Sequence, residues 1–492
     1  MDTEAPIMKL SEYADYDAVG LARLIAHGDV SAAELARTAG EAIEAVNPAV
    51  NAVVEHWPAD AAGPTVAAGS GPLAGVPFLI KDLALPMAGK RMELGSRLAA
   101  GLVSPSDSML MRRLRAAGLV TLGRTATPEM AFSTATESVQ FGATRNPWNL
   151  ALSAGGSSGG AAAAVAAGIV PLAHATDAAG SIRVPAAFTG LFGLKPTRGR
   201  ISNGPELDEV FAGLGVQGGL SRTVRDSAAL LDAMHGMAAG EPYHTSAPAQ
   251  TFLSEVGRDP GRLRIGLMLE PFDGARAAPA MTQATLDAAG HLEMLGHDIE
   301  PITPVLGVSW EAFVLATARI WCATLVGWID GVAAATARPI DGTTLEPSTL
   351  AAYRYGKQVT GPDFASALAV RNAVTRSTAD WFRRVDVLLS PTMPNLPEAI
   401  GDYYVGAQRT DGLQWTERLF RHSPYTPVFN VAGLPAMSVP LFHDEASGLP
   451  IGVQFGAGFA QEATLLRLAG QLEQTIPWRR RRPAVWAGSC AA

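Results

Sequence analysis

Two glycine-rich segments of the sequence carry serines that could act as nucleophiles. The first is SAGGSSGG, residues 153–160, and the second is DAAGSIRVP, residues 177–185. Small residues beside a serine allow backbone N–H groups to turn toward a carbonyl oxygen, and such groups stabilise the oxyanion of acyl transfer. Ser181 lies 24 residues after Ser157. One helix and one strand fit into that interval, so we expect the two hydroxyls to be able to meet.

Lys81 is the candidate base that such serines need, because a serine hydroxyl alone is a weak nucleophile. It ends an apolar run, residues 76–80, that is typical of a buried strand. A lysine with its ordinary pKa of about 10.4 is protonated at neutral pH, but burial disfavours the ammonium and lowers that pKa. Lys81 could instead pair with Asp82 or lie at the exposed end of the strand. The sequence leaves these alternatives open.

Two further interpretations of the first segment compete with a serine pair. A phosphate-binding loop needs Gly-Lys-Ser/Thr after its glycines, and the sequence has no such ending. Residues 156–160 match G-x-S-x-G, the nucleophile elbow of α/β hydrolases, which would make Ser158 the nucleophile. An elbow follows a strand, whereas the preceding residues contain Pro147 and predict a loop, and His422 and His443 stand in no catalytic context. The elbow is the weaker interpretation.

The elements that must position these residues alternate between β-branched runs and alanine-rich helical runs, which predicts an α/β fold. Strands are predicted at 75–80, 119–123, 170–176 and 263–269, and helices at 110–117, 161–167 and 281–295.

The N-terminal part predicts two helices between residues 15 and 46. Gly28 ends the first helix, and Ser31 with Glu34 forms a capping box that opens the second. The pair Asn47–Pro48 is expected to end it.

Residues 305–425 are less periodic and include five of the nine tryptophans, namely Trp310, Trp321, Trp328, Trp381 and Trp415. We expect helices there that cover a pocket, with core packing as the alternative role for each tryptophan. We interpret the chain as one domain in three parts: N-terminal helices in residues 1–70, the core in 71–240 and a C-terminal part in 241–492.

Composition restricts the compartment and the partners of the chain. It has 492 residues, 48% of them hydrophobic and 17% charged, with a net charge of −8. This negative charge argues against nucleic-acid or membrane partners. Cys322 and Cys490 cannot make a disulfide framework, and no signal-peptide pattern opens the sequence, so we expect a cytoplasmic protein. The apolar stretch 160–175 is too short to span a membrane.

The chain resembles the amidase signature family from about residue 15 to residue 480. The matching motifs are LAGVPFLIKD (73–82), GRTATPEM (123–130), GATRNPWN (142–149), GGSSGG (155–160), GSIRVPA (180–186), GLKPTRGRIS (193–202), PVFNVAGLPAMSVPL (427–441) and GLPIGVQ (448–454). The resemblance implies a single α/β/α domain with a large, mixed, twisted β-sheet flanked by helices, and no metal or cofactor.

The resemblance also implies a role for each candidate residue. Ser181 would form the acyl-enzyme, Ser157 would relay its proton from a cis peptide arrangement, and Lys81 would be the base. Backbone N–H groups from Ala178 through Ala179 and Gly180 to Ser181 would form the oxyanion hole. The remaining implied residues are Ala131 and Cys322 against the substrate, and Ser158, Asp177 and Arg183 in support.

Two residues depart from the usual pattern of the family. Ala179 stands where a glycine is common, and if that position needs a positive φ the alanine would cost about 1 kcal/mol. Ala126 replaces a frequent asparagine. We expect an alkaline-leaning hydrolase, because its base must be neutral to act.

The substrate is not fixed by these motifs. DAAGSIRVPA and the Trp321–Cys322 pair look like those of nylon-oligomer amidases, while related members of the family accept aryl acylamides, peptide amides, esters or carbamates (urethanes). Glutaminase subunits of tRNA-dependent amidotransferases and non-catalytic homologues share the scaffold. We expect a small-molecule amide as substrate and, by family habit, a homodimer.

Overall fold

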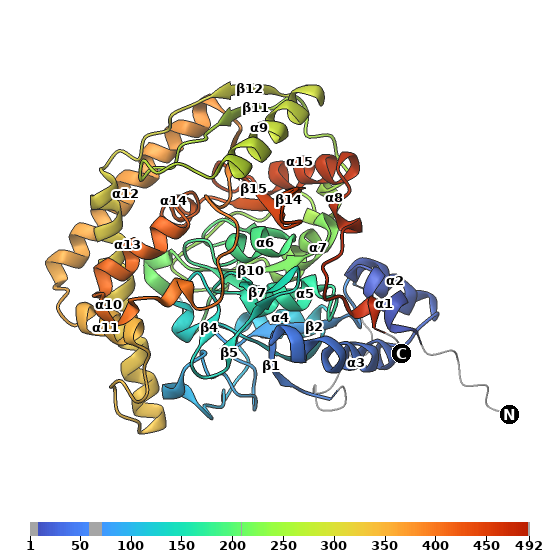
Figure 1. Cartoon of the computed structure of the whole chain (residues 1–492), viewed down its shortest axis with the longest axis horizontal. Helices are drawn as coiled ribbons and strands as arrows, with labels where there is room; N and C mark the ends of the chain where they lie inside the picture. The colour runs from blue at the N-terminus through green and yellow to red at the C-terminus, as the bar shows by residue number, and fades with distance from the viewer. Residues whose placement is uncertain (1–7, 59–70, 208, 491–492) are drawn as a thin grey trace.

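A computed structural model describes residues 8–58, 71–207 and 209–490. The centre of the fold is an eleven-stranded sheet flanked by helices (Figure 1). In spatial order the strands are β1 (Val53–His56), β3 (Val120–Thr125), β2 (Pro77–Lys81), β8 (Leu172–Asp177), β10 (Val216–Ser221), β9 (Phe192–Lys195), β14 (Ala436–His443), β15 (Pro450–Ala457), β13 (Val387–Pro391), β11 (Arg264–Leu267) and β12 (Asp298–Pro301).

The sheet is mixed, as the sequence predicts. Strand β2 runs parallel to β3 and β8, and β11 runs parallel to β12 and β13. The other neighbouring strands pair antiparallel. They are the edge pair β1–β3 and each successive pair in the series β8, β10, β9, β14, β15 and β13. Because β2 and β8 are parallel neighbours, their carboxyl ends bring Lys81 and Asp177 to the same edge of the sheet.

One predicted loop contains strands. Around Pro147, the strands β6 (Arg145–Asn146) and β7 (Asn149–Ser153) pair antiparallel, and another short pair, β4 (Glu137–Ser138) with β5 (Gly142–Ala143), precedes them. Pro147 lies in the turn between β6 and β7, where no N–H is needed for the ladder. The prediction of a loop from this proline was therefore wrong for β7.

The N-terminal part has three helices, one more than the sequence predicts, and the two longer ones follow the sequence signals with two differences. The three helices are α1 (Leu10–Asp15), α2 (Ala18–His27) and α3 (Ala32–Val50). Gly28 ends α2 in the left-handed region, and Ser31 Oγ accepts the Glu34 N–H at the start of α3. The Glu34 carboxylate, however, accepts from the N–H of Met8 instead of completing a capping box.

Helix α3 also runs past Pro48 and ends at Asn51, which has a φ of 49°. The proline removes only one helical N–H, and the Asn47 side chain closes the end by accepting the N–H groups of Ala52 and Val53. Of the predicted N-terminal part, residues 1–7 and 59–70 lie outside the described residues.

The helices that pack around the sheet include one built almost wholly from glycine and alanine. All eight residues of α5 (Gly159–Ala166) are buried, which is feasible because side chains this small let a helix pack closely against strands on several sides. The others are α4 (Met109–Ala116), α6 (Arg183–Thr189), α7 (Val224–Met234), α8 (Phe252–Glu255), α9 (Pro279–Met294), α14 (Pro427–Ala432) and α15 (Glu462–Thr475).

Four helices lie between residues 305 and 425 and gather on one side of the sheet, at the left of Figure 1. They are α10 (Trp310–Thr336), α11 (Pro347–Gly356), α12 (Gly361–Arg384) and α13 (Gly412–His422). By length and composition α10 could cross a membrane, but 56% of its most apolar window is buried inside the protein. Its apolar side chains Phe313, Ile320 and Leu325 belong to a hydrophobic core, so α10 packs as a core helix.

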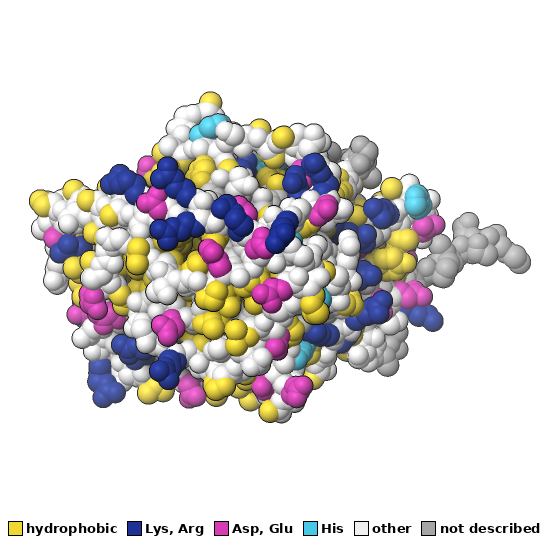
Figure 2. Space-filling view, turned by 90° about the horizontal axis from the view of Figure 1, so that it is seen from above, with side chains coloured by type: hydrophobic (Ala, Val, Ile, Leu, Met, Phe, Trp, Pro, Cys, Tyr) yellow, Lys and Arg dark blue, Asp and Glu magenta, His cyan; other side chains and the backbone are white. Residues whose placement is uncertain are grey.

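The surface carries charges of both signs. Figure 2 shows basic and acidic side chains interspersed over one face of the molecule. Exposed pairs such as Arg264 with Asp386, 2.8 Å apart, join neighbouring parts of the sheet edge. Such pairs contribute little to stability because water and salt screen them.

Candidate active site

Lys81 lies at the end of β2 with a fully buried side chain surrounded by hydroxyl groups. Its Nζ is 2.7 Å from Ser157 Oγ, 2.9 Å from Thr176 Oγ1 and 3.1 Å from Ser158 Oγ. Burial lowers the pKa of Lys81 to about 7, although the Asp177 carboxylate acts in the opposite direction. A large fraction of the amine is therefore neutral at physiological pH and can accept a proton.

The alternative pairing of Lys81 with its neighbour Asp82 does not form. The Asp82 carboxylate instead accepts the backbone N–H groups of Glu93 and Gly95, at 2.8 and 3.2 Å. Burial raises the pKa of Asp82 to about 7. Asp82 thus holds the loop that follows β2, and the Lys81 amine forms its hydrogen bonds with hydroxyl groups.

The protons of these hydroxyl groups are not equally available. Ser158 Oγ donates to the carbonyl of Thr176 and accepts the Thr176 N–H, each at 3.3 Å. A neutral lysine amine has one lone pair and two N–H donors. Since the Ser158 proton is engaged, Ser157 and Thr176 remain as donors to that lone pair, and Ser157 is the nearer of the two.

Ser157 lies just before α5, and the Gly156–Ser157 peptide bond is cis. Gly156 is required here because an added Cβ would lie 2.9 Å from the backbone N of Ala135. The next residue, Ser158, donates its backbone N–H to the carbonyl oxygen of Ser181 over 3.3 Å. The two glycine-rich segments therefore lie side by side, as their spacing predicts.

Ser181 follows β8 on a short loop that leads into α6. Gly180, which precedes it, has a φ of +137°, and an added Cβ would lie 2.5 Å from Thr426 Oγ1, so only glycine fits. Ala179 is not among the described residues with positive φ. The strain considered for Ala179 therefore does not arise, and the conformational demand falls on Gly180.

The backbone donors before Ser181 differ from the predicted set in one residue. Gly180 gives its N–H to Asp177 Oδ1 over 2.7 Å, and is thereby withdrawn from the oxyanion hole. In the described part of the chain, the N–H groups of Ala178, Ala179 and Ser181 donate to no protein acceptor. These three remain available to a substrate oxygen.

Asp177 and Arg183 form a fully buried, two-bond ion pair beneath this loop, with both N···O distances 3.0 Å. Burial would raise the pKa of Asp177, but the Arg183 guanidinium outweighs it and holds the pKa below its ordinary value. Arg183 also donates to the Thr426 carbonyl, to Gln454 and to Asn430. The pair fixes the loop to distant parts of the chain.

Two narrow cavities meet at Ser181. The Ser157 cavity, of about 40 Å³, is lined by Ser157, Thr176, Gln217 and Trp328 among others. The Trp321 cavity, of about 30 Å³, is lined by Phe132, Ser133, Thr134, Trp321 and Ser423 among others. Ala131, Ala178, Phe211 and Ser181 line both. Ser181 thus has space on two sides, one for each half of a substrate.

The predicted substrate-contacting residues have different outcomes. Ala131 lines both cavities, where a bound substrate would contact it. Cys322 is fully buried and lines neither cavity, whereas its neighbour Trp321 does. Ser158 is also absent from both linings, which disfavours the nucleophile-elbow interpretation.

Several walls of these cavities have a left-handed backbone without glycine. Met130, Ala131 and Phe211 have φ values of 52°, 56° and 51°. Met130 and Ala131 belong to a short 3-10 helix, Glu129–Ala131, and Phe211 to another, Val210–Gly213. Strained backbone of this kind clusters at functional sites, although Asn51 and Ala337 at helix ends have it too.

His174 and Thr176 are site residues that the sequence analysis missed. Burial lowers the pKa of His174 to about 3, so the ring is neutral. Its Nδ1 accepts the backbone N–H of Lys81, and its Nε2 lies 2.7 Å from Gln217 Oε1. His174 and Thr176 stand at alternate positions of β8, so their side chains lie on one face of the strand. This spacing is the signal in the sequence that could have identified them.

The described residues contain no group of three His, Cys, Asp or Glu side chains placed to hold a metal ion.

The sequence of the chain matches the Amidase family model over residues 34–466. The chain belongs to the Amidase family.

Relatives within the Amidase family match over nearly the whole chain. A 6-aminohexanoate-cyclic-dimer hydrolase of Paenarthrobacter ureafaciens is 37% identical over 479 residues, covering 95% of this chain and 96% of the relative. A solved structure of a 6-aminohexanoate cyclic dimer hydrolase complexed with substrate superposes with a TM-score of 0.91 at 35% identity, covering 96% of this chain and 99% of that one.

A bacterial aryl acylamidase of the amidase signature family superposes with a TM-score of 0.85 at 26% identity, covering 94% of this chain and 97% of that chain. The α/β fold with its large mixed sheet is thus shared across the Amidase family. Membership makes the chain a hydrolase that cleaves amide bonds.

Proposed function

We propose that the chain hydrolyses small-molecule amides through an acyl-enzyme, with Ser181 as nucleophile, Ser157 as proton relay and Lys81 as base. The observation that carries the proposal is the buried Lys81 Nζ, 2.7 Å from Ser157 Oγ, in a cavity wall that Ser157 shares with Ser181. A lysine whose pKa is about 7 is matched to general-base catalysis near neutral pH.

The first half of the reaction breaks the C–N bond. Ser181 Oγ attacks the carbonyl carbon and gives its proton to Ser157, whose own proton passes to Lys81. The carbonyl oxygen gains negative charge, which the free N–H groups of the loop before Ser181 stabilise. As the C–N bond breaks, the proton returns through Ser157 to the leaving amine.

The second half regenerates the enzyme. Water attacks the acyl carbon, passes a proton to Ser157 and thence to Lys81, and the Ser181 ester bond breaks to release the carboxylic acid. The same relay returns a proton to Ser181 Oγ, so the hydroxyls and the amine end as they began.

The substrate class in this proposal follows the relatives. Their names include the 6-aminohexanoate cyclic dimer and aryl acylamides, so we propose cyclic or linear acylamides as the principal substrates, with carbamates as a side activity. The enzyme would act on them without nucleic acid, membrane or cofactor, in the cytoplasm and as a homodimer.

The proposal is tested with the purified full chain and a panel of p-nitroacetanilide, linear and cyclic aminohexanoate oligomers, an aryl carbamate and glutamine. We expect turnover of the acylamides, labelling of Ser181 by a sulfonyl fluoride, and loss of both in Ser181→Ala. Full turnover by Ser181→Ala would overturn the mechanism. Activity on glutamine alone, and only with added partner subunits, would identify an amidotransferase subunit instead.

A further inference from the structure

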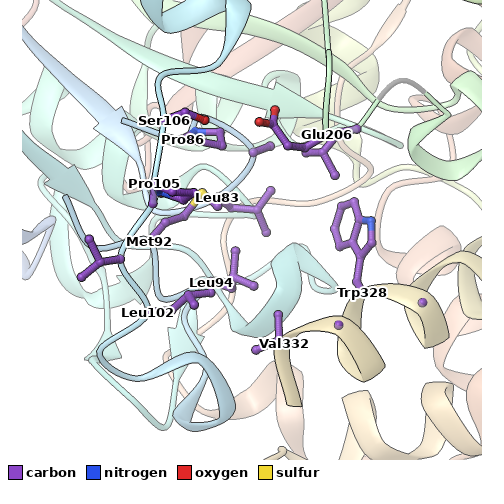
Figure 3. Close-up of a pocket in the computed structure, with 16 residues that line it drawn as sticks. Leu83, Pro86, Met92, Leu94, Leu102, Pro105, Ser106, Glu206, Trp328 and Val332 are labelled. Carbon is purple, nitrogen blue, oxygen red and sulfur yellow. The ribbon is translucent and has the colours of Figure 1, made fainter. Parts of the chain in front are cut away.

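A large apolar cavity, whose lining is drawn in Figure 3, adjoins the Ser157 cavity. Its volume is about 490 Å³, whereas the Ser157 cavity holds about 40 Å³. Leu83, Ala84, Leu207 and Trp328 line both, so the two cavities are direct neighbours. This volume lies in the range of about 300–1,000 Å³ that is common for small-molecule sites. We refer to it as the outer cavity.

The walls of the outer cavity suit an unbranched apolar chain. Met92, Leu94, Leu102 and Val332 face the same space as Trp328 in Figure 3. Val103 at the rim is 50% exposed, so the cavity opens to solvent. A substituent that extends from the Ser157 cavity past the side chains that line both cavities would bury apolar surface along the walls and end at the rim.

One side of the outer cavity is formed by two glycines on α10. Gly327 and Gly331 are one helical turn apart, and an added Cβ at either would meet no atom within 4 Å. Glycine lowers helix stability by up to about 1 kcal/mol relative to alanine. No close packing demands glycine at these positions, so their effect is to keep this side of the cavity open.

The chemistry of the proton relay fixes which half of the substrate points there. The leaving nitrogen receives its proton from Ser157 and must lie beside that hydroxyl. Ser157 lines the Ser157 cavity but not the Trp321 cavity. The amine half of the substrate therefore occupies the Ser157 cavity, and the acyl half faces the Trp321 cavity.

We propose that the outer cavity binds an extended apolar arm on the amine side of the scissile amide. The preferred substrates combine a short acyl group, which the narrow Trp321 cavity admits, with a long alkyl or aryl-alkyl amine. This specificity rests on the proposed function, because it takes Ser181 as the nucleophile and Ser157 as the donor to the leaving amine.

The test compares two isomeric amides, N-octylacetamide and N-methylnonanamide, which differ only in the side of the amide that carries the eight-carbon chain. Released amine or acid is quantified by chromatography, and p-nitroacetanilide serves as the short reference. We expect kcat/KM for N-octylacetamide to exceed that for its isomer by at least about tenfold. Equal values, or the opposite preference, would overturn the inference.

A cavity-filling variant gives the second arm of the test. Gly331→Phe should lower kcat/KM for N-octylacetamide by at least about tenfold and leave p-nitroacetanilide turnover unchanged. Gly290→Phe is the matched control, because Gly290 lies in α9, outside the cavity lining, and also has no atom within 4 Å of an added Cβ. A Gly331→Phe enzyme that keeps full activity on N-octylacetamide, or loses equal activity on both substrates, would contradict the assignment.

Failure of this inference is distinct from failure of the proposed function. If p-nitroacetanilide is cleaved and Ser181 is labelled by a sulfonyl fluoride, while the isomers are treated alike, only the outer cavity assignment is wrong. If neither the short substrate nor the label reacts, the proposed function itself is wrong.

Discussion

The carboxylate of Asp177 accepts the backbone N–H of Gly180 over 2.7 Å, so the residue directly before the candidate nucleophile does not present its N–H to the substrate. The loop that follows β8 is thereby held by Asp177, the last residue of that strand. The donors left for an oxyanion come from residues on either side of Gly180. This arrangement separates two demands on the loop, since one residue supplies the unusual conformation and others supply the hydrogen bonds.

Gly180→Ala should damage the site, whereas Ala179→Gly should not. The new Cβ at position 180 would lie 2.5 Å from Thr426 Oγ1 in a backbone with a φ of +137°. We expect kcat to fall by at least about a hundredfold if the oxyanion donors are displaced. Ala179→Gly should keep wild-type kcat and lower stability by about 0.4–1 kcal/mol through the unfolded state. Steady-state kinetics and urea unfolding check both, and equal kcat for the two variants would refute the assignment of strain.

The pH dependence of activity should report the Lys81 amine. Burial lowers its pKa to about 7, and only the neutral form accepts a proton, so kcat/KM should rise as pH increases through about 7 and then level off. Lys81→Met should abolish turnover. A wild-type profile without this rise between pH 5 and 9, measured with p-nitroacetanilide, would contradict the role of Lys81.

The same buried amine should make stability depend on pH. Its folded pKa of about 7 lies below its ordinary value of 10.5, so the unfolded chain binds one more proton between these values. The free energy of unfolding should therefore rise with pH across that window by up to about 1.4 kcal/mol per unit more than in Lys81→Met. Urea unfolding of the two proteins at pH 7.5 and 9 measures the difference, and parallel curves would argue against a depressed pKa.

Ser157→Ala and Ser158→Ala should differ although both hydroxyls contact Lys81. Removing the relay should lower kcat by about 10²–10⁴-fold. Removing Ser158 Oγ takes away hydrogen bonds to Lys81 and Thr176, which should cost about tenfold or less. Rates with p-nitroacetanilide distinguish them. A larger loss in Ser158→Ala would favour the elbow interpretation.

Asp177→Asn should strongly destabilise the fold, because it leaves the Arg183 guanidinium buried without its anion. The expected cost is about 3–5 kcal/mol, measured by urea unfolding. Asp386→Asn, which breaks the exposed pair with Arg264, is the control and should leave the midpoint unchanged. If Asp177→Asn does not fold, Arg183→Lys keeps the charge but loses the two-bond geometry and should still lower the midpoint. Unchanged midpoints would show that the pair does not hold the loop.

Glu206 should influence the end of the amine-side arm. It is the only charged residue among the described lining of the outer cavity. Wild type should therefore favour N-acetyl-1,6-diaminohexane over N-acetyl-6-aminohexanoate by a few-fold, and less so at high salt. Glu206→Gln should remove this preference in kcat/KM. A preference that survives in the variant would assign it to other groups.

Local patterns in the sequence were sufficient to locate much of this site. The apolar run before Lys81 predicts a buried strand end, and the structure has the lysine there. The spacing of Ser157 and Ser181 allows one helix and one strand between them, and both serines line one cavity. The strand starts and ends differ from the predicted ones by one or two residues, because pairing in the sheet decides them and local composition does not.

Other features depend on contacts that no local pattern contains. Arg183 reaches Gln454 across 271 residues and Asn430 across 247. Both partners lie in family motifs, but neither motif indicates which distant side chain its polar residue contacts. Trp321 lines a cavity while Cys322 does not, because the rotation of a long, largely apolar helix about its axis is set by packing against neighbours. For the same reason the outer cavity was not predicted, although the tryptophan-bearing region that contributes to it was.

The bonds from Arg183 to Thr426, Asn430 and Gln454 also limit how this gene can be recombined. A chimera that imports residues 71–240 from another family member would join an imported Arg183 segment to acceptors that come from this chain. Crossovers should therefore succeed only when residues 426–454 come from the same parent. The motif that contains Arg183 and the segments that contain its acceptors are far apart in the sequence, so the unit that is inherited intact is split across the chain.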